Sequence, residues 1–384
     1  MRAGSWILFL SSLLLVAAPP AGLDLAALAK IKPRMQEFVD KGTAAGFVTL
    51  VAQHGTVAHL EAVGFQDREN RKPMSVDTIF QIMSMTKPVT VAGVMTLEDE
   101  GRLSINDPVE KYLPEFKGQK LKDGSKPDHP ITIVELMTHT SGLPSGSTEG
   151  FDRHMHTLAE VVADAARQPL EFEPGSKWSY SNNGIATLGR IIEVLSGKPY
   201  EEFMAERIFR PLGMSDTCYW LPKEKESRLA SLYTDDHGIL KLSTEDKLRK
   251  GYKHPSPEGG LYSTATDLFH FYQMMLNQGT FAGHRVLSPV AVELMTTLHT
   301  GDLKAGFAPG MGYGLGFAIV KDVNGMFRMN SLGAYGHGGA YRTYGFADPK
   351  RDLIGVILYQ RTNGGGDLAD EQTAFIELAN AAVR

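Results

Sequence analysis

The chain has 384 residues, of which 42% are hydrophobic and 22% are charged, and it contains a single cysteine. Its formal net charge of -5, from 39 Lys and Arg against 44 Asp and Glu, comes without long basic runs and argues against a nucleic-acid-binding protein. One cysteine excludes an intrachain disulfide, and the length is sufficient for two domains.

The first 21 residues have the pattern of an export signal. Arg2 precedes an unbroken stretch of apolar and small residues, Trp6–Ala18, which is followed by Pro-Pro-Ala. A basic start, a short apolar run and a small residue near its end are typical of a secretory signal. The run is shorter than the ~20 residues that span a bilayer. We therefore expect residues 1–21 to direct export to the periplasm or the medium, with no stable membrane insertion after their removal.

Helical and strand patterns alternate along the first 110 residues. A helical apolar period covers residues 23–42 and ends at Gly42, which is a C-cap signal. Two β-rich runs within residues 46–67 flank His54-Gly55 and predict a hairpin. After a loop that contains Pro73, a helix begins near Ser84 and runs to residue 101.

The middle of the chain, roughly residues 107–236, has helical patterns and few strand signals. Helical runs at 157–168 and 182–209 are separated by loops rich in proline and glycine. A long helical pattern at 264–279 opens the last part. Strand-like runs and one closing helix follow, at residues 313–322, 341–349 and 353–360 and at residues 370–384 respectively.

This order of elements predicts an α+β fold. Strands from both ends of the chain would pair in one antiparallel sheet, and helices from both ends would cover it. Residues 22–110 and 240–384 would form this sheet domain, and residues 111–239 an inserted, mostly helical domain. We expect the active site in the cleft between the two.

The predicted helix near Ser84 carries the first candidate site. Ser84 and Lys87 are three residues apart, so their side chains share one face of a helix, and the sequence around them, IMSMTKPV, is largely apolar. A serine hydroxyl needs a neighbour that accepts its proton, and a lysine can do so when burial lowers its pKa. Taken alone, the pattern also fits a helix-capping serine followed by a surface lysine.

Two distant motifs supply further candidates. Tyr180-Ser181-Asn182 is the only Tyr-x-Asn in the chain and precedes a helical pattern. A tyrosine beside a lysine can relay a proton, and an asparagine amide can orient a lysine or a substrate. His337-Gly338-Gly339 precedes a strand pattern, where paired glycines let a substrate approach the backbone and a strand N–H bind an oxyanion. In isolation, the two motifs also fit a buried tyrosine beside a helix cap and a turn with a surface histidine.

In the order Ser-x-x-Lys, Tyr-x-Asn and His-Gly-Gly, the three motifs resemble those of the serine-reactive penicillin-recognising superfamily. This superfamily includes class C β-lactamases, D-Ala-D-Ala carboxypeptidases and family VIII carboxylesterases, which share the class C β-lactamase fold. Other stretches are similar to the superfamily as well, among them ITIVELMTHTSGLP and EGGLYSTATDLFHF. The resemblance extends over most of the chain, from about residue 46 to residue 348.

The resemblance implies a role for each motif. Ser84 would be the acylated nucleophile, and Lys87 and Tyr180 would share the general-base and general-acid work. The other implied site residues orient the substrate or bind its oxyanion through backbone N–H groups: Asn182, His337, Gly338 and Gly339 for orientation, and Ser84 with Ala340 for the oxyanion hole. No metal ion and no cofactor are implied.

Departures from the superfamily pattern separate its members. Where β-lactamases and carboxypeptidases usually have Lys-Thr-Gly, His337 offers a mostly neutral imidazole and the motif has no hydroxyl, which weakens a clamp for an anionic substrate. The side-chain amide that β-lactamases often place after the Leu-Pro segment is replaced by Ser145 and Gly146. Together with SMTKPVT, which looks like the esterase version of the first motif, these departures favour a family VIII carboxylesterase.

We therefore expect a serine hydrolase that cleaves short-chain carboxylic esters through an acyl-Ser84 intermediate, with β-lactam hydrolysis as a side activity. Its partner would be a small-molecule ester and no nucleic acid, and the sequence leaves the oligomeric state open. The alternatives are a class C-like β-lactamase, a D-Ala-D-Ala carboxypeptidase or, in another class, a non-catalytic scaffold of the same fold.

An α/β-hydrolase mechanism is disfavoured because the chain has no Gly-x-Ser-x-Gly. A Ser-His-Asp triad through His139 or His337 is the alternative mechanism for Ser84. His139 is expected to stabilise its loop instead. Arg342, five residues after His337, is expected at the surface; the alternative is that it partly replaces the cation missing from the third motif.

Overall fold

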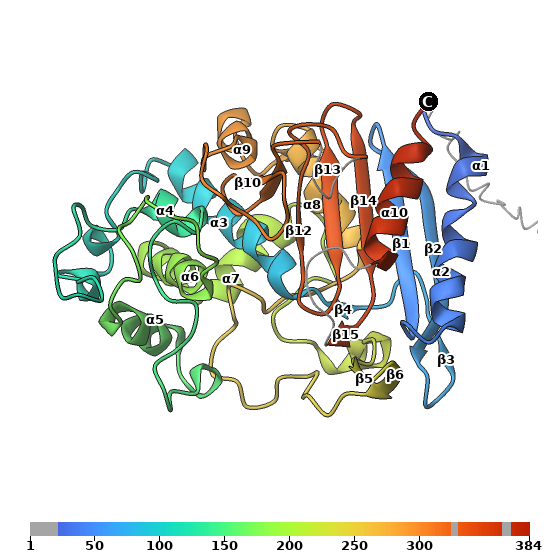
Figure 1. Ribbon diagram of the computed structural model, residues 1–384, viewed down its shortest axis with the longest axis horizontal. Coiled ribbons are helices and arrows are strands. Elements are labelled where there is room, and N and C mark those ends of the chain that lie inside the picture. The colour runs from blue at the N-terminus through green and yellow to red at the C-terminus, as the bar shows by residue number, and fades with distance from the viewer. Residues whose placement is uncertain (1–21, 324–328, 363–369) are drawn as a thin grey trace, which may run out of the picture.

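The computed structural model describes residues 22–323, 329–362 and 370–384 (Figure 1). The predicted export signal lies outside these residues. In Figure 1 the long strands stand beside α1, α2 and α10 on one side, and the helical middle of the chain occupies the other. Within the described ranges, no helix combines the length and the apolar character needed to cross a membrane.

The predicted helix at residues 23–42 is two helices, α1 (Leu25–Leu28) and α2 (Ile31–Asp40). Pro33 explains the break. It lies in the first turn of α2, where its missing N–H has no helical acceptor to lose, whereas in one continuous helix it would remove an interior hydrogen bond. Both helices contact α10 (Asp370–Ala381), which is the predicted closing helix.

The predicted hairpin is formed by β1 (Gly46–Gln53) and β2 (Thr56–Asp67), which pair antiparallel. His54 and Gly55 make the turn with φ angles of 50° and 74°. Two successive left-handed residues give the turn whose twist matches that of the flanking strands.

An eight-stranded antiparallel sheet lies at the centre of the fold, in the order β10-β11-β12-β13-β14-β1-β2-β3. β1 pairs with β14, with Val48 opposite Leu358, so strands from the two ends of the chain meet as predicted. The other strands of the sheet are β3 (Lys72–Pro73), β10 (Met311–Tyr313), β11 (Ala318–Val320), β12 (Tyr335–Gly338), β13 (Tyr344–Asp348) and β14 (Leu353–Leu358).

Two of the predicted strand runs are shorter than expected. The run at residues 313–322 contains a turn between β10 and β11, where Gly316 has φ 76°. A Cβ at this glycine would also lie 2.8 Å from Val91, so the turn requires a residue without a side chain. The run at residues 341–349 begins as a turn, because Arg342 has φ 72°, and β13 starts only at Tyr344.

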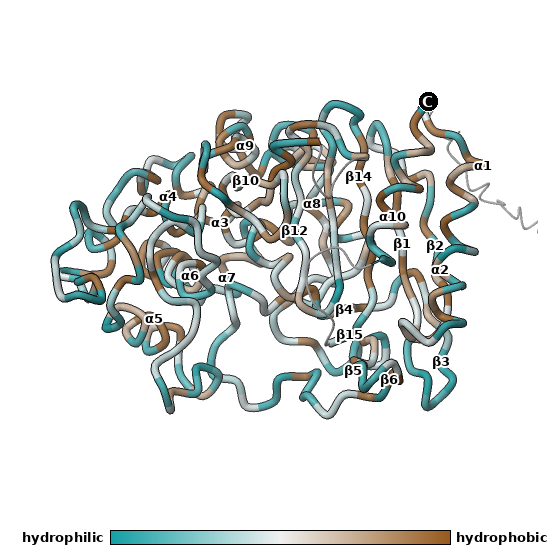
Figure 2. The backbone as a smooth tube through the Cα atoms, in the orientation of Figure 1, coloured by the Kyte–Doolittle hydropathy of each residue, from teal (hydrophilic) through white to brown (hydrophobic). Residues whose placement is uncertain are grey.

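Both faces of the sheet are covered, which explains why every residue of β1 is buried. Phe47 and Val51 face the core formed with α2 and α10. Val48 and Leu50 face the opposite, larger core, which includes α8 (Ala265–Leu276). In Figure 2 hydrophobic colours gather on the central strands, and hydrophilic colours on outer loops such as the one beside β3.

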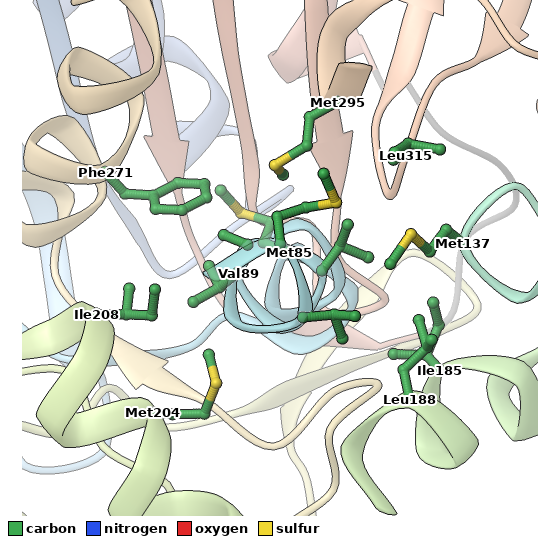
Figure 3. Close-up of a cluster of buried hydrophobic side chains, with 14 of the residues drawn as sticks. Met85, Val89, Met137, Ile185, Leu188, Met204, Ile208, Phe271, Met295 and Leu315 are labelled. Atoms are coloured by element: carbon green, nitrogen blue, oxygen red, sulfur yellow. The ribbon is translucent and has the colours of Figure 1, made fainter. Parts of the chain in front are cut away.

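The larger core surrounds α3 (Thr86–Asp99), which is the predicted helix after Ser84. Every residue from Thr86 to Leu97 is buried, as expected for a helix that is apolar on all sides. Figure 3 shows α3 end-on, with side chains from several other elements around it, including Met137, Leu188 and Phe271. Lys87 is the one ionisable residue of this buried stretch.

The middle of the chain is mostly helical, as predicted, with α5 (Leu158–Arg167) and α6 (Asn182–Ser196) as its longest helices. The predicted run at 182–209 is interrupted because Gly197, with φ 69°, ends α6 and Pro199 follows. Two short strands were not predicted: β5 (Tyr233–Asp236) and β6 (Ile239–Leu242). The remaining helices and strands named below or drawn in Figure 1 are α4 (Ile133–Met137), α7 (Tyr200–Met204), α9 (Pro289–Thr296), β4 (Phe80–Gln81), β7 (Tyr262–Ser263) and β15 (Arg361–Thr362). The division into a sheet domain and a domain at 111–239 stays a prediction.

Candidate active site

Ser84 lies on a single 3-10 turn, Met83–Met85, that leads directly into α3. The preceding residue, Met83, has φ 49°, a left-handed conformation that is uncommon for a residue with a side chain and often marks a functional site. The N-cap position of α3 is Met85 rather than Ser84. The Ser84 hydroxyl is therefore available for another partner, and the helix-cap interpretation is wrong.

That partner is Lys87. Its Nζ lies 3.0 Å from Ser84 Oγ and donates a second hydrogen bond of 2.7 Å to the backbone carbonyl of Glu258. The Lys87 side chain has no exposed surface, so the surface-lysine interpretation is also wrong. Burial lowers the pKa of Lys87 to about 7; the Glu258 carboxylate opposes this change and the Arg153 guanidinium adds to it. Near neutral pH a large fraction of this amine is unprotonated and able to accept the serine proton.

Tyr180 lies over the lysine, with its ring centroid 4.6 Å from Lys87 Nζ. Its position is set by the start of α6, where the hydroxyl of the N-cap, Ser181, accepts the Gly184 N–H at 3.1 Å. Asn182 is the first residue of α6 and lines the same cavity as Ser84. The structure therefore brings the first two predicted motifs together from distant parts of the chain.

His139 holds the Tyr180 loop. Its ring is buried, its Nδ1 accepts the Ser181 N–H at 3.2 Å, and its centroid is 4.4 Å from that of Tyr180. Burial and the neighbouring Lys87 lower its pKa well below the usual value, so the imidazole is neutral. The sequence predicts that His139 stabilises the loop or the core after its own helix; it is buried, and these contacts are with the loop that carries Tyr180. Within the described residues neither His139 nor His337 forms an ion pair with a carboxylate, which argues against the Ser-His-Asp triad.

The third motif lies at the end of β12. His337 is buried rather than at the surface, and its Nδ1 donates to the Gly338 carbonyl at 2.6 Å. Burial, with a smaller effect of Lys87, lowers its pKa to about 3, so it is a neutral group as predicted. A Cβ on Gly339 would lie 2.3 Å from the carbonyl oxygen of Ile82, two residues before Ser84. Only glycine allows this close approach, which brings the next residue, Ala340, to the wall of the Ser84 cavity.

Arg342 is buried, which contradicts its predicted surface position. Its left-handed backbone turns the chain back under the end of β12, with its N–H donating to the Gly339 carbonyl at 2.8 Å. Its own carbonyl accepts a hydrogen bond from Gln372 of α10. The backbone turn and this contact with α10 hold Arg342 in the interior.

The cavity beside Ser84 has a volume of about 460 Å³. Its walls come from the loop before α3, the start of α6, the end of β12 and two loops that the sequence did not single out. Its lining is rich in charged side chains of both signs, Arg153, Arg249, Glu245, Asp246 and Glu258, and also includes His154. Among these residues only Glu258 belongs to a stretch that resembles the superfamily, EGGLYSTATDLFHF; the others lie in polar stretches without a recognisable motif. No group of three or more His, Cys, Asp or Glu in the described ranges is arranged to hold a metal ion.

The comparison with known proteins agrees with this arrangement. A family model described as "Beta-lactamase" matches residues 31–379. The chain belongs to the beta-lactamase family. It is 37% identical over 361 residues to Protein Rv1367c of Mycobacterium tuberculosis, covering 85% of this chain and 88% of that one. It is 29% identical over 375 residues to Esterase EstB of Burkholderia gladioli, covering 88% and 91% of the two chains.

Among solved structures, the fold is similar to that of "EstCE1, a hydrolase with promiscuous acyltransferase activity". The TM-score is 0.80 with 26% sequence identity, and the match covers 93% of this chain and 99% of the other. The predicted family and fold class are therefore confirmed, and with them the prediction that the chain is a serine hydrolase of the β-lactamase fold.

Proposed function

We propose that the protein is a carboxylesterase that cleaves short-chain esters through an acyl-Ser84 intermediate. The observation that carries the proposal is the 3.0 Å contact between Ser84 Oγ and a fully buried Lys87, whose pKa lies at about 7. A lysine in that state is a general base at neutral pH, and a serine in contact with it is an activated nucleophile. The similarity to proteins named as an esterase and a hydrolase supports the same enzyme class.

In the acylation step Ser84 Oγ attacks the ester carbonyl carbon and its proton passes to Lys87 Nζ, directly or through Tyr180. The carbonyl oxygen takes the negative charge, and we assign its stabilisation to the backbone N–H groups of Ser84 and Ala340, two residues that line one cavity. The tetrahedral intermediate then collapses: the bond to the alcohol oxygen breaks, and that oxygen takes the proton from Lys87 or Tyr180.

Deacylation repeats the sequence with water. Water attacks the acyl carbonyl carbon of Ser84 and gives its proton to the same base, the oxyanion forms again, and the bond to Ser84 Oγ breaks. Oγ recovers its proton and the carboxylic acid leaves. We assign Asn182, at the cavity wall, to orienting the substrate and Lys87 in both steps.

The third motif favours an ester over a β-lactam or a D-Ala-D-Ala peptide. A carboxylate-bearing substrate is held best by a cation and a hydroxyl, whereas His337 is neutral and two glycines follow it. A neutral acyl ester needs no such clamp. We therefore propose that β-lactam hydrolysis is at most a side activity.

A rate comparison tests this proposal. Under the same conditions, kcat/KM is measured for p-nitrophenyl butyrate, for nitrocefin and for a D-Ala-D-Ala peptide. The proposal expects the butyrate ester to be the fastest by at least about tenfold, a difference of about 1.4 kcal/mol in transition-state binding. Faster turnover of nitrocefin or of the peptide would instead support the β-lactamase or the carboxypeptidase alternative, and no turnover of any of the three would support a scaffold.

A further inference from the structure

Glu258, whose backbone carbonyl binds the catalytic lysine, forms an ion pair through its side chain. Arg153 Nη2 is 2.6 Å from Glu258 Oε1, and the two side chains are 15% and 9% exposed. Arg153 lies on a 3-10 turn, Arg153–Met155, of the mostly helical middle of the chain. Glu258 belongs to a loop more than a hundred residues later in the chain. Its backbone carbonyl oxygen accepts the 2.7 Å hydrogen bond from Lys87 Nζ.

The two segments that carry the pair are joined along their length. The ring of His154 stacks on Tyr252 at 4.2 Å, and the His154 carbonyl accepts the Lys253 N–H at 2.8 Å. His254 Nδ1 donates to the His156 carbonyl at 2.7 Å. The contacts between the two segments therefore hold both members of the ion pair in the cavity wall.

Each charge of the pair is compensated mainly by the other. Arg153 Nε and Nη2 and Glu258 Oε2 are all buried without a hydrogen-bond partner among the described residues, so charge attraction alone joins the pair. Removing one partner leaves the other charge uncompensated near Lys87. The electrostatic effect on the lysine would then have opposite signs for the two removals, because a lone carboxylate stabilises the ammonium form and a lone guanidinium destabilises it.

We propose that Arg153 and Glu258 are positioning residues that set the protonation state of Lys87 through the balance of their two charges, while the Glu258 backbone carbonyl holds its amine. This proposal rests on the proposed function only for its kinetic readout. Neither side chain takes part in bond making or breaking.

The two histidines near Lys87 add no charge to its surroundings. His139 and His337 also face the lysine, but burial keeps the pKa of both well below the usual histidine value, so both stay neutral at neutral pH. Tyr180 contacts the ammonium with its ring. Glu258 and Arg153 act on the pKa of Lys87 in opposite directions, the first raising it and the second lowering it.

Hydrogen bonds on both sides of Glu258 hold the loop that carries it. The hydroxyl of Thr90, one turn along α3, donates to the carbonyl of Pro257 at 2.6 Å. The Gly260 N–H donates to the Ser256 carbonyl at 2.7 Å. Because these bonds do not involve the ion pair, a variant that neutralises one charge of the pair keeps the loop in place, and its effect reports on charge.

The test is the pH dependence of kcat/KM on p-nitrophenyl butyrate, a substrate that carries no charge. Arg153→Met should move the acidic limb to higher pH by about 0.5 to 1 unit, and Glu258→Gln should move it to lower pH by a similar amount. Arg153→Lys, which keeps the positive charge, should restore the limb to within a few tenths of a unit of the wild type, as should the double variant R153M/E258Q. These signs hold whichever of Lys87 and Tyr180 carries the proton, because removing a nearby cation raises the pKa of both groups.

Arg228→Met provides the matched control. Arg228 makes a two-pronged pair with Asp216 at 2.7 and 2.8 Å, is 29% exposed, and does not line the Ser84 cavity. It should leave the limb unchanged. Shifts of the same sign for Arg153→Met and Glu258→Gln, or no shift in either, would overturn the proposal.

A second readout needs no activity. The ε-carbon resonance of Lys87, assigned by its absence in Lys87→Met, reports the pKa of the lysine directly in each variant. An inactive wild type whose Lys87 pKa still moves in opposite directions would refute the proposed function and support the charge balance. An active wild type with no movement would do the reverse.

Discussion

Replacing Lys87 with methionine should make the protein more stable and inactive at the same time. Lys87 is the one ionisable side chain in a stretch of α3 that is buried on every side, and Met137, Met204 and Met295 already pack around that helix (Figure 3). Methionine has a similar length and an apolar, flexible chain, so it can fill the same space. The substitution removes the free-energy cost of burying an ionisable amine in the core.

That free energy follows from the pKa. The difference between the ordinary value of 10.5 and about 7 corresponds to roughly 5 kcal/mol at pH 7 and below. The variant also loses the hydrogen bond to the Glu258 carbonyl, and an unsatisfied buried carbonyl costs roughly 1–3 kcal/mol. We therefore expect Lys87→Met to be more stable than the wild type by about 2–4 kcal/mol at pH 7.

The sign of the pH dependence is fixed as well. Because the folded-state pKa of Lys87 lies below its unfolded-state value, the unfolded wild type binds more protons between pH 7 and 10.5, and its stability rises with pH in this window. The advantage of the variant should fall by about 1.4 kcal/mol per pH unit above pH 7 and vanish between about pH 8 and about pH 10.

Urea unfolding of the two proteins at several pH values measures this difference, and the exposed Lys41→Met provides a control whose difference should not depend on pH. The activity of Lys87→Met on p-nitrophenyl butyrate should drop by about 10³-fold or more. A variant that is less stable than the wild type at pH 7, or a difference that stays constant from pH 7 to 9, would refute the account of Lys87 as a buried amine of lowered pKa.

Three further outcomes follow from the site and from the first residues of the chain. Gly339→Ala should lower kcat, measured by steady-state kinetics, by about 10²-fold. The added Cβ would lie 2.3 Å from the Ile82 carbonyl oxygen and would displace Ala340 from the oxyanion position. An unchanged kcat would contradict this. Tyr180→Phe should lower kcat by about 10²- to 10⁴-fold with little change in KM, since the ring contact to Lys87 persists and the proton relay is lost; an equal rise in KM would point to binding instead. We also propose that residues 1–21 direct export, so cell fractionation should find the full-length chain's product outside the cytoplasm and a chain starting at residue 22 inside it. An equal distribution of the two would contradict the export proposal.

The sequence predicted the parts of the fold that depend on local periodicity. The hairpin at His54-Gly55, the buried helix after Ser84 and the long helix at 264–279 follow from patterns that neighbouring residues set. The meeting of β1 and β14 followed from the distribution of strand patterns along the chain. The missed strands β5 and β6 are only four residues long each. The residues of β5 are buried or half-buried without alternation and most of β6 is exposed, so neither has the apolar alternation that identifies a strand.

The site could be predicted to the extent that its residues form motifs. Ser84, Lys87 and Tyr180 were identifiable because their spacing matches a known pattern, and the structure brings them into contact. The wall around them was not, because Arg153, Glu258 and the other charged residues lie in loops whose packing is decided by tertiary contacts. The error over Arg342 has the same origin, since a left-handed turn and a contact with α10 bury it.

The identity of the nucleophile is the central claim, and intact-mass measurement after treatment with a serine-reactive phosphonate tests it most directly. The account predicts one phosphonate adduct on the wild-type protein, located by peptide mapping to Ser84, and no adduct on Ser84→Ala. An adduct that persists on Ser84→Ala, or a wild-type protein that turns over p-nitrophenyl butyrate without forming any adduct, would contradict it.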